Sequence, residues 1–132
     1  MVVEGLKSIN SLHDVSTTVD QLEAILKGKG MEIFGRIDHA ANATKAGLSM
    51  PPTEVLIFGN PKVGTPLMLN APSIALDLPL KMMATLDANG QVTLSWACPL
   101  YLKSRHQIEG CDEIIDNIAI ALEAVASAAT SA

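Results

Sequence analysis

The stretch LKMMATLDANGQVTLSWA, residues 80–97, carries the strongest local indication of structure in the chain. Two runs of residues that favour β-strands flank DANG, a short polar turn that contains Asn89 and Gly90. Asn-Gly pairs are typical of tight turns between antiparallel strands, because both residues tolerate a positive φ angle. The stretch therefore predicts a β-hairpin, and a hairpin favours an antiparallel sheet.

The residues before the hairpin predict alternating strands and helices. Strands are expected over 1–9, 31–37 and 53–59, with one helix within 15–30 and an alanine-rich helix that ends at Gly47. In the first helix Val19, Leu22 and Leu26 recur at helical spacing, and a Ser/Thr cluster can cap its start. The segment TEVLIFG is apolar nearly throughout, which predicts a strand buried on both faces.

Prolines limit the length of the helices predicted for residues 60–79. Four prolines within residues 60–79 exclude one continuous helix and predict two short helical pieces near 65–69 and 72–76. Residues 99–106 are expected to form a loop or one helical turn, and residues 110–129 a helix with one apolar stripe. Together these elements predict a single α+β domain over 1–132, in which helices pack on one face of an antiparallel sheet.

Composition excludes several classes of function. The chain has 132 residues and a net charge of -5, and its nine Lys and Arg residues form no cluster that could bind nucleic acid. The apolar stretch near the C-terminus is shorter than the roughly 20 residues of a membrane span. Without an export signal, Cys98 and Cys111 are expected to be reduced thiols in the cytoplasm. Neither their spacing nor that of the histidines predicts a metal or a cofactor.

A sheet with helices on one face leaves the other face and two edge strands uncovered. Small domains of this kind commonly cover such surfaces by pairing with a second copy. A homodimer is therefore expected.

Three motifs resemble the family named domain-of-unknown-function family 302. They are IDHAA with KAGL within 37–48, FGNPKVGTPLM at 58–68 and LDLPLK at 76–81, in the family's order and spacing over roughly residues 15–105. The resemblance implies a fold of the TATA-binding-protein-like class, β-α-β4-α with short helical insertions, and a dimer as its state. It does not imply DNA binding, because a fold class does not determine function.

The pair Asp38-His39 supports two hypotheses. Asp38 can cap the alanine-rich helix by accepting the N–H of residue 40 or 41, so that Asp38→Ala would cost about 1 kcal/mol. Alternatively, His39 acts as the general base of a small enzyme, oriented by Asp38 or Asp77 and completed by His106 or Cys98. The first hypothesis leaves His39 exposed on the first turn.

The segment GNPKVGTP, residues 59–66, can also be read in two ways. Asn60 and Thr65 can cap helices that begin with proline, or the free N–H groups and Lys62 can attract an anion. The two hypotheses are compatible, since a loop that is rigid for structural reasons can also hold a ligand. Because the sequence contains no catalytic spacing, we expect a small-ligand binding or interaction module, with a purely structural homodimer as a further alternative. The pocket of the binding module would be formed by residues 36–39, 59–66 and 76–79. The candidate polar contacts to a small anionic ligand are Arg36, Asp38, His39, Asn60, Lys62, Thr65 and Asp77. The pocket and the His39 enzyme both require Asp38, His39 and Asn60 to share one cleft.

Overall fold

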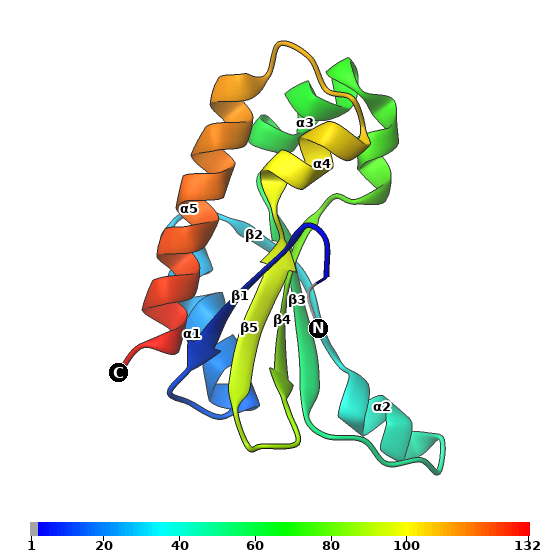
Figure 1. Ribbon diagram of the computed structural model, residues 1–132, viewed down its shortest axis with the longest axis vertical. Helices are drawn as coiled ribbons and strands as arrows, with labels where there is room; N and C mark the ends of the chain where they lie inside the picture. The colour runs from blue at the N-terminus through cyan, green and yellow to red at the C-terminus, as the bar shows by residue number, and fades with distance from the viewer. Residues whose placement is uncertain (1–2) are drawn as a thin grey trace.

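A computed structural model describes residues 3–132 as a five-stranded antiparallel sheet with helices on one face and at one end (Figure 1). The strand order is β1-β5-β4-β3-β2, so β1 and β2 form the two edges. The elements follow the chain as β1 (Leu6–Ser11), α1 (Val15–Gly28), β2 (Glu32–Asp38), α2 (His39–Lys45), β3 (Thr53–Gly59), α3 (Pro61–Asn70), the 3-10 helix η1 (Pro72–Leu76), β4 (Leu80–Leu86), β5 (Val92–Ala97), α4 (Pro99–Arg105) and α5 (Asp112–Thr130). The predicted fold class and the β-α-β4-α order are confirmed.

The predicted hairpin is the pair β4 and β5, joined in register from Met82–Trp96 to Leu86–Val92. Its turn is closed by the Asp87 carboxylate, which accepts hydrogen bonds from the backbone N–H groups of Asn89 and Gln91. Gly90 has a φ of +83°, which is the conformation that makes glycine necessary at this position. The turn is thus held by side-chain and backbone bonds that the local sequence provides.

The main core lies between the sheet and the helices α1 and α5. Phe58 and Leu94 on the sheet and Leu22 on α1 are fully buried, and Val125 of α5 is 2% exposed. The strand β3 is buried on this face only, because Val55 and Ile57 point to the opposite face and are partly exposed. The prediction that β3 is buried on both faces is therefore wrong for the isolated chain.

A second apolar cluster lies at the end of the sheet where α3, η1 and α4 gather against the first half of α5 (Figure 1). Leu67 of α3 and Ile74 of η1 pack with Leu102 of α4 and Ile115 of α5, each 5% exposed or less. Ile118 of α5 packs against both clusters, so the two cores meet along this helix.

Local helix predictions were partly wrong. The N-cap of α1 is Asp14, which accepts the N–H of Thr17, and not a residue of the Ser/Thr cluster. The first predicted helical piece is instead one helix from Pro61 to Asn70, with Pro66 in its interior. Asn60 caps this helix, whereas Thr65 lies inside it and caps nothing. A proline inside a helix removes one backbone hydrogen bond and crowds the carbonyl four residues before it, but the helix can continue when packing of the neighbouring turns offsets this cost.

Candidate functional site

A pocket of about 460 Å³, which we call the junction pocket, lies where the two apolar clusters meet. Its walls come from the start of β2, the end of β3, α3, the segment before β4 and one face of α5. The lining residues include Met31, Phe34, Gly59, Asn60, Lys62, Thr65, Leu67, Met68, Leu78, Leu80, Ile114, Asn117, Ile118, Ala121 and Leu122. This size is typical of pockets that hold a small organic molecule.

Small residues in the walls leave the pocket open. Gly64 on α3 and Ala121 on α5 line it, and neither has a side chain that could reach across the space. A Cβ atom built on Gly64 would lie 3.6 Å from Leu78 and 3.9 Å from Met68, an ordinary contact distance. The cavity therefore results from the choice of small side chains where α3 and α5 diverge.

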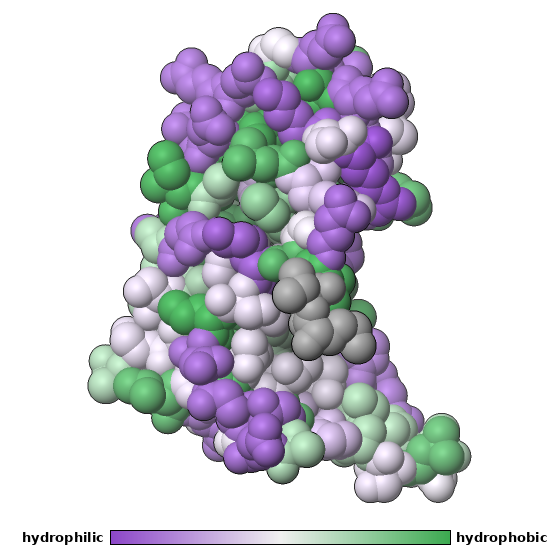
Figure 2. Space-filling model, viewed as in Figure 1, coloured by the Kyte–Doolittle hydropathy of each residue, from purple (hydrophilic) through white to green (hydrophobic). Residues whose placement is uncertain are grey.

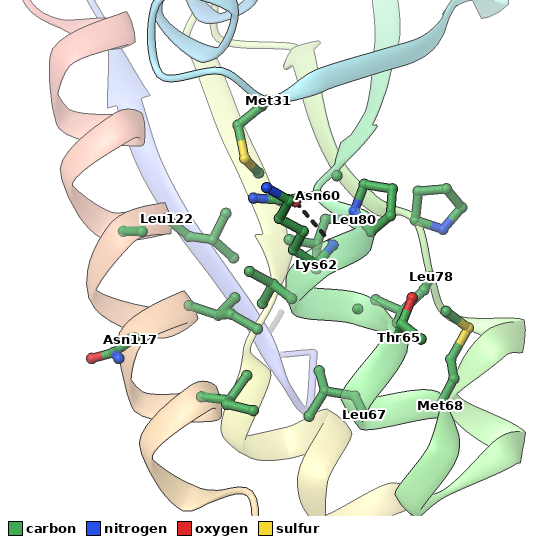
Figure 3. A pocket seen from close by; sticks show the side chains of 18 of the residues that line it. Met31, Asn60, Lys62, Thr65, Leu67, Met68, Leu78, Leu80, Asn117 and Leu122 are labelled. Carbon is green, nitrogen blue, oxygen red and sulfur yellow. Dashed lines mark hydrogen bonds between the residues drawn. The ribbon is translucent and has the colours of Figure 1, made fainter.

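The pocket has a polar end and an apolar end. Figure 3 shows the side chains of Asn60 and Lys62 together beside Met31, whereas Leu67 and Met68 lie at the opposite end. The Asn60 Oδ1 atom accepts the backbone N–H of Lys62 at 3.0 Å, which orients the amide. Within residues 3–132, neither the Asn60 amide nitrogen nor the Lys62 ammonium has another hydrogen-bond partner or ion pair. Both donors are available to a ligand.

The structure separates the predicted site residues into groups. Asn60, Lys62 and Thr65 line the junction pocket, but Asp38 and His39 do not. Asp38 pairs with Glu54 at the start of β3, and Asn60 follows the other end of that strand, roughly 20 Å away at 3.3 Å per residue. Within residues 3–132, Asp38 and His39 therefore share no pocket with Asn60. The predicted pocket is wrong for residues 36–39, whereas residues 59–65 and 78–79 of the other two predicted segments do line the observed pocket. Because β2 and β3 are antiparallel, the start of β2 lies beside the end of β3, and Met31 and Phe34 therefore line the pocket together with Asn60.

Arg36 is part of a structural ion network and not of the pocket. Its Nε atom donates to Glu54 at 2.8 Å, and its two Nη atoms donate to Asp20 and to the carbonyl of Ser16. Burial by itself lowers the pKa of the guanidinium, but the hydrogen bonds that it donates to Asp20 and Glu54, together with their negative charges, outweigh burial and raise the pKa. Because these bonds tie β2 and β3 to α1, Arg36 is not free to bind the ligand assigned to it.

Asp38 is the N-cap of α2, as one hypothesis predicted. Its carboxylate accepts the N–H of Ala41 at 2.8 Å, and Gly47 beyond the helix has a φ of +78°. No residue of α2 is buried, however, and the helix projects from the end of the sheet (Figure 1). The cap therefore stabilises a peripheral element.

Replacing Asp38 with Ala is expected to unfold α2 locally and to change the free energy of global unfolding of the protomer by less than about 0.5 kcal/mol. This is smaller than the sequence-based value, since α2 buries no side chain whose burial would be lost. Amide hydrogen exchange should accelerate within residues 39–45 only. A denaturant midpoint lowered as much as by a core substitution would contradict this expectation, and Asp38→Ser should restore the slow exchange.

His39 and Asp77 lie in different environments. His39 is exposed, and its ring has no hydrogen-bond partner among residues 3–132. Asp77 instead contacts His106, with 2.5 Å between Oδ2 and Nε2, and accepts two bonds from Arg105. The enzyme hypothesis built on His39 with Asp77 is therefore wrong, because the 3-10 helix before Asp77 turns its carboxylate toward α4.

Sequence reasoning missed the α5 wall of the pocket. Ile114 and Ile118 belong to the apolar stripe that was assigned to packing on the sheet, yet both remain half-buried and line the cavity. A signal was present, because Asn117 and Ala121 continue the same face with a polar and a small side chain. Among residues 3–132, no group of three His, Cys, Asp or Glu side chains is placed to hold a metal ion.

Comparison with known families identifies the chain. The sequence profile described as "Domain of unknown function DUF302" matches residues 7–125. The chain belongs to the DUF302 family. A crystal structure titled "uncharacterized conserved protein DUF302 from Bacillus stearothermophilus" superposes with a TM-score of 0.85 over 96% of this chain and 99% of that one. At 19% sequence identity, this similarity shows the fold alone.

Curated relatives of this DUF302 chain carry the name of a membrane protein. "Fluoride-specific ion channel FluC 1" of Brucella suis is 43% identical over 108 residues, as is the protein of the same name from Brucella abortus. The match covers 82% of this chain but only 42% and 40% of those two proteins. The chain thus spans about two-fifths of their length. Within residues 3–132 there is no helix with the length and apolar character needed to cross a bilayer.

Proposed function

We propose that this DUF302 domain binds a small amphipathic anion in the junction pocket. The observation that supports this most directly is the pairing of an apolar cavity of about 460 Å³ with two available donors, Asn60 and Lys62, at one end. A carboxylate or phosphate can accept both donors, while a hydrocarbon or aromatic body fills the space between α3 and α5. The family has no assigned reaction, and the proposal is one of binding and not of catalysis.

Apolar burial is expected to supply most of the affinity and Lys62 part of the selectivity. Each methylene that leaves water contributes about 0.8 kcal/mol before the cost of immobilising the ligand. Lys62 is exposed, so its charge is screened by solvent and contributes less than a buried cation would. A medium-chain carboxylate such as decanoate is a suitable probe, with decanol as its uncharged match.

Replacing Lys62 with Met is expected to weaken decanoate binding roughly tenfold and to leave decanol binding unchanged. Methionine keeps the apolar stem and removes the charge, so only the interaction with the carboxylate is lost. Isothermal calorimetry and the ligand-induced rise in Tm would measure both ligands. Lys45→Met on α2 is the matched control, because Lys45 is exposed and does not line the pocket. Equal weakening of decanol, or no binding of decanoate by the unmodified chain, would refute the proposed function.

We further propose that a second copy of the chain covers the open face of the sheet. Ile37, Val55 and Met83 lie side by side across β2, β3 and β4 on this face, followed by Ser95 on β5. This row contains no charge, so two copies could meet along it although the net charge is -5. Leu48 and Met50 beyond α2 add exposed apolar surface at the projecting tip, which is green in Figure 2.

The dimer is tested by sedimentation equilibrium. The unmodified chain and Ala24→Lys, a change on the exposed side of α1, should both sediment with twice the chain mass. Met83→Lys should sediment as a monomer, because it places a charge inside the proposed interface. A monomeric unmodified chain would exclude the dimer without affecting the proposed ligand.

We also propose a reducing compartment such as the cytoplasm. In support, neither Cys98 nor Cys111 is paired in a disulfide.

A second candidate function follows from the Brucella relatives. We propose that the matched region acts as an accessory module of proteins that also carry a fluoride channel. In support, the match leaves more than half of each relative outside it, and no helix within residues 3–132 could span a bilayer. Fluoride efflux from liposomes containing the Brucella suis protein, with and without the matched region, tests this. Equal fluxes would argue against it.

A further inference from the structure

A hydroxyl, an imidazole and a carboxylate form a hydrogen-bonded chain at the end of the molecule where η1 meets α4. The Ser73 Oγ atom lies 2.7 Å from His106 Nδ1, and His106 Nε2 lies 2.5 Å from Asp77 Oδ2. The Arg105 Nη1 atom donates to both oxygens of the same carboxylate, at 3.1 and 3.0 Å. None of these residues lines the junction pocket.

The second apolar cluster holds these side chains in place. Ser73 directly precedes Ile74 on η1, and Asp77 directly follows η1. His106 directly follows α4, whose Leu102 packs in the same cluster as Ile74. The His106 side chain is only 5% exposed, whereas Ser73 is open to solvent. A buried base thus lies beneath an accessible hydroxyl group.

The partners determine which ring nitrogen carries the proton when His106 is neutral. The carboxylate of Asp77 can only accept, so Nε2 carries the hydrogen and Nδ1 presents its lone pair to the Ser73 hydroxyl. A hydroxyl, a base and a group that orients the base are the three parts of an activated nucleophile. Ser73 also lies in the first turn of η1, where within the described residues its backbone N–H has no hydrogen-bond partner and could stabilise an oxyanion.

We propose that Ser73 is an activated nucleophile that accepts acyl groups from small esters. Ser73 Oγ forms a bond to the carbonyl carbon while its proton moves to His106 Nδ1, and the carbonyl electron pair moves onto oxygen. Collapse of this intermediate restores the carbonyl and breaks the ester C–O bond, and the leaving alkoxide takes the proton from His106. Water then attacks the acyl-serine, loses a proton to His106, and releases a carboxylic acid as the Ser73 hydroxyl is restored.

The surface beside Ser73 indicates the acyl groups that fit. Side chains three residues apart eclipse on a 3-10 helix, which places Leu76 on the same side as Ser73. Leu76 is 76% exposed, and the uncovered surface favours a short apolar acyl chain over a long one. The site is open, so esters with good leaving groups are the expected substrates.

A fluorophosphonate probe and p-nitrophenyl acetate test the proposal on the purified chain. Mass spectrometry should locate the phosphonate on Ser73 and not on Ser104, an exposed serine of α4 that serves as a control within the same molecule. Hydrolysis of p-nitrophenyl acetate should release an initial burst of nitrophenolate and should be lost in Ser73→Ala but not in Ser104→Ala.

His106→Gln separates chemistry from structure. Glutamine can still donate to Asp77 and accept from Ser73, but it cannot take the proton, so labelling of Ser73 should slow at least about 100-fold. Asp77→Asn should slow it as well, because an amide favours the tautomer with hydrogen on Nδ1. Labelling of Ser73 at the rate of Ser104, or an unchanged rate in His106→Gln, would overturn the proposal. Neither result bears on decanoate binding in the junction pocket.

Discussion

Replacing Ala121 with Trp is expected to weaken decanoate binding by at least about a hundredfold, which corresponds to roughly 2.7 kcal/mol. Ala121 lies on α5 in the wall of the junction pocket, and an indole at this position would occupy the space assigned to the ligand body. Decanol binding should be lost together with decanoate binding, since the exclusion is steric and does not depend on charge. Calorimetry on both ligands measures the effect.

The same substitution should raise the stability of the chain. In the free protein, the indole would bury its own apolar surface against the walls of the cavity. Filling a cavity in this way commonly adds about 1 kcal/mol to the free energy of unfolding. Ala124→Trp is the matched control, because Ala124 is exposed on the same helix and does not line the pocket. If Ala121→Trp binds decanoate as the unmodified chain does, the ligand is not in this pocket. A lower Tm for Ala121→Trp would show that the site is not an open cavity.

Replacing Arg36 with Met is expected to lower the free energy of unfolding by about 2–3 kcal/mol. Methionine keeps most of the apolar stem, but it leaves the Glu54 carboxylate, whose side chain is 10% exposed, without its charged partner. The lower end of the range for buried ion pairs applies because the Arg36 side chain is itself about a quarter exposed. Urea denaturation monitored by the single tryptophan, Trp96, measures the loss.

A second substitution shows whether the loss arises from the unpaired carboxylate. The double variant Arg36→Met with Glu54→Gln removes the uncompensated charge and should recover at least half of the stability lost. Decanoate binding should stay unchanged in both variants, since Arg36 does not line the pocket. A loss below about 0.5 kcal/mol for Arg36→Met, or a change in decanoate affinity, would instead favour the ligand-binding role that the sequence suggested.

The sequence predicted the elements well because their signals are local. The hairpin turn at Asn89-Gly90, the Asp38 cap and the stop of α2 at Gly47 all depend on residues within a few positions of one another. Prolines were read less well. Pro66 was interpreted as the start of a helix, but α3 continues across Pro66, and the adjacent Leu67 packs in the second apolar cluster.

The candidate site was predicted only in part, since it depends on the pairing of distant segments. Asn60, Lys62 and Thr65 were placed in a pocket with Asp38 and His39 because they share a family motif set, not because any local signal joined them. The antiparallel register of β2 and β3 determines which residues share the pocket. It pairs Asp38 with Glu54, far from Asn60, and places Met31 and Phe34 near Asn60.

The sequence by itself determined the α+β class, the order of strands and helices, the hairpin and the helix caps at Asp38 and Asn60, since spacing and turn chemistry act within one or two turns of chain. Only the tertiary structure decided that Arg36 supports the core, that α5 completes a pocket with Lys62, and that Ser73 meets His106. These contacts join residues 16 to 60 positions apart, and which of many such pairings forms depends on the packing of the whole sheet and its helices.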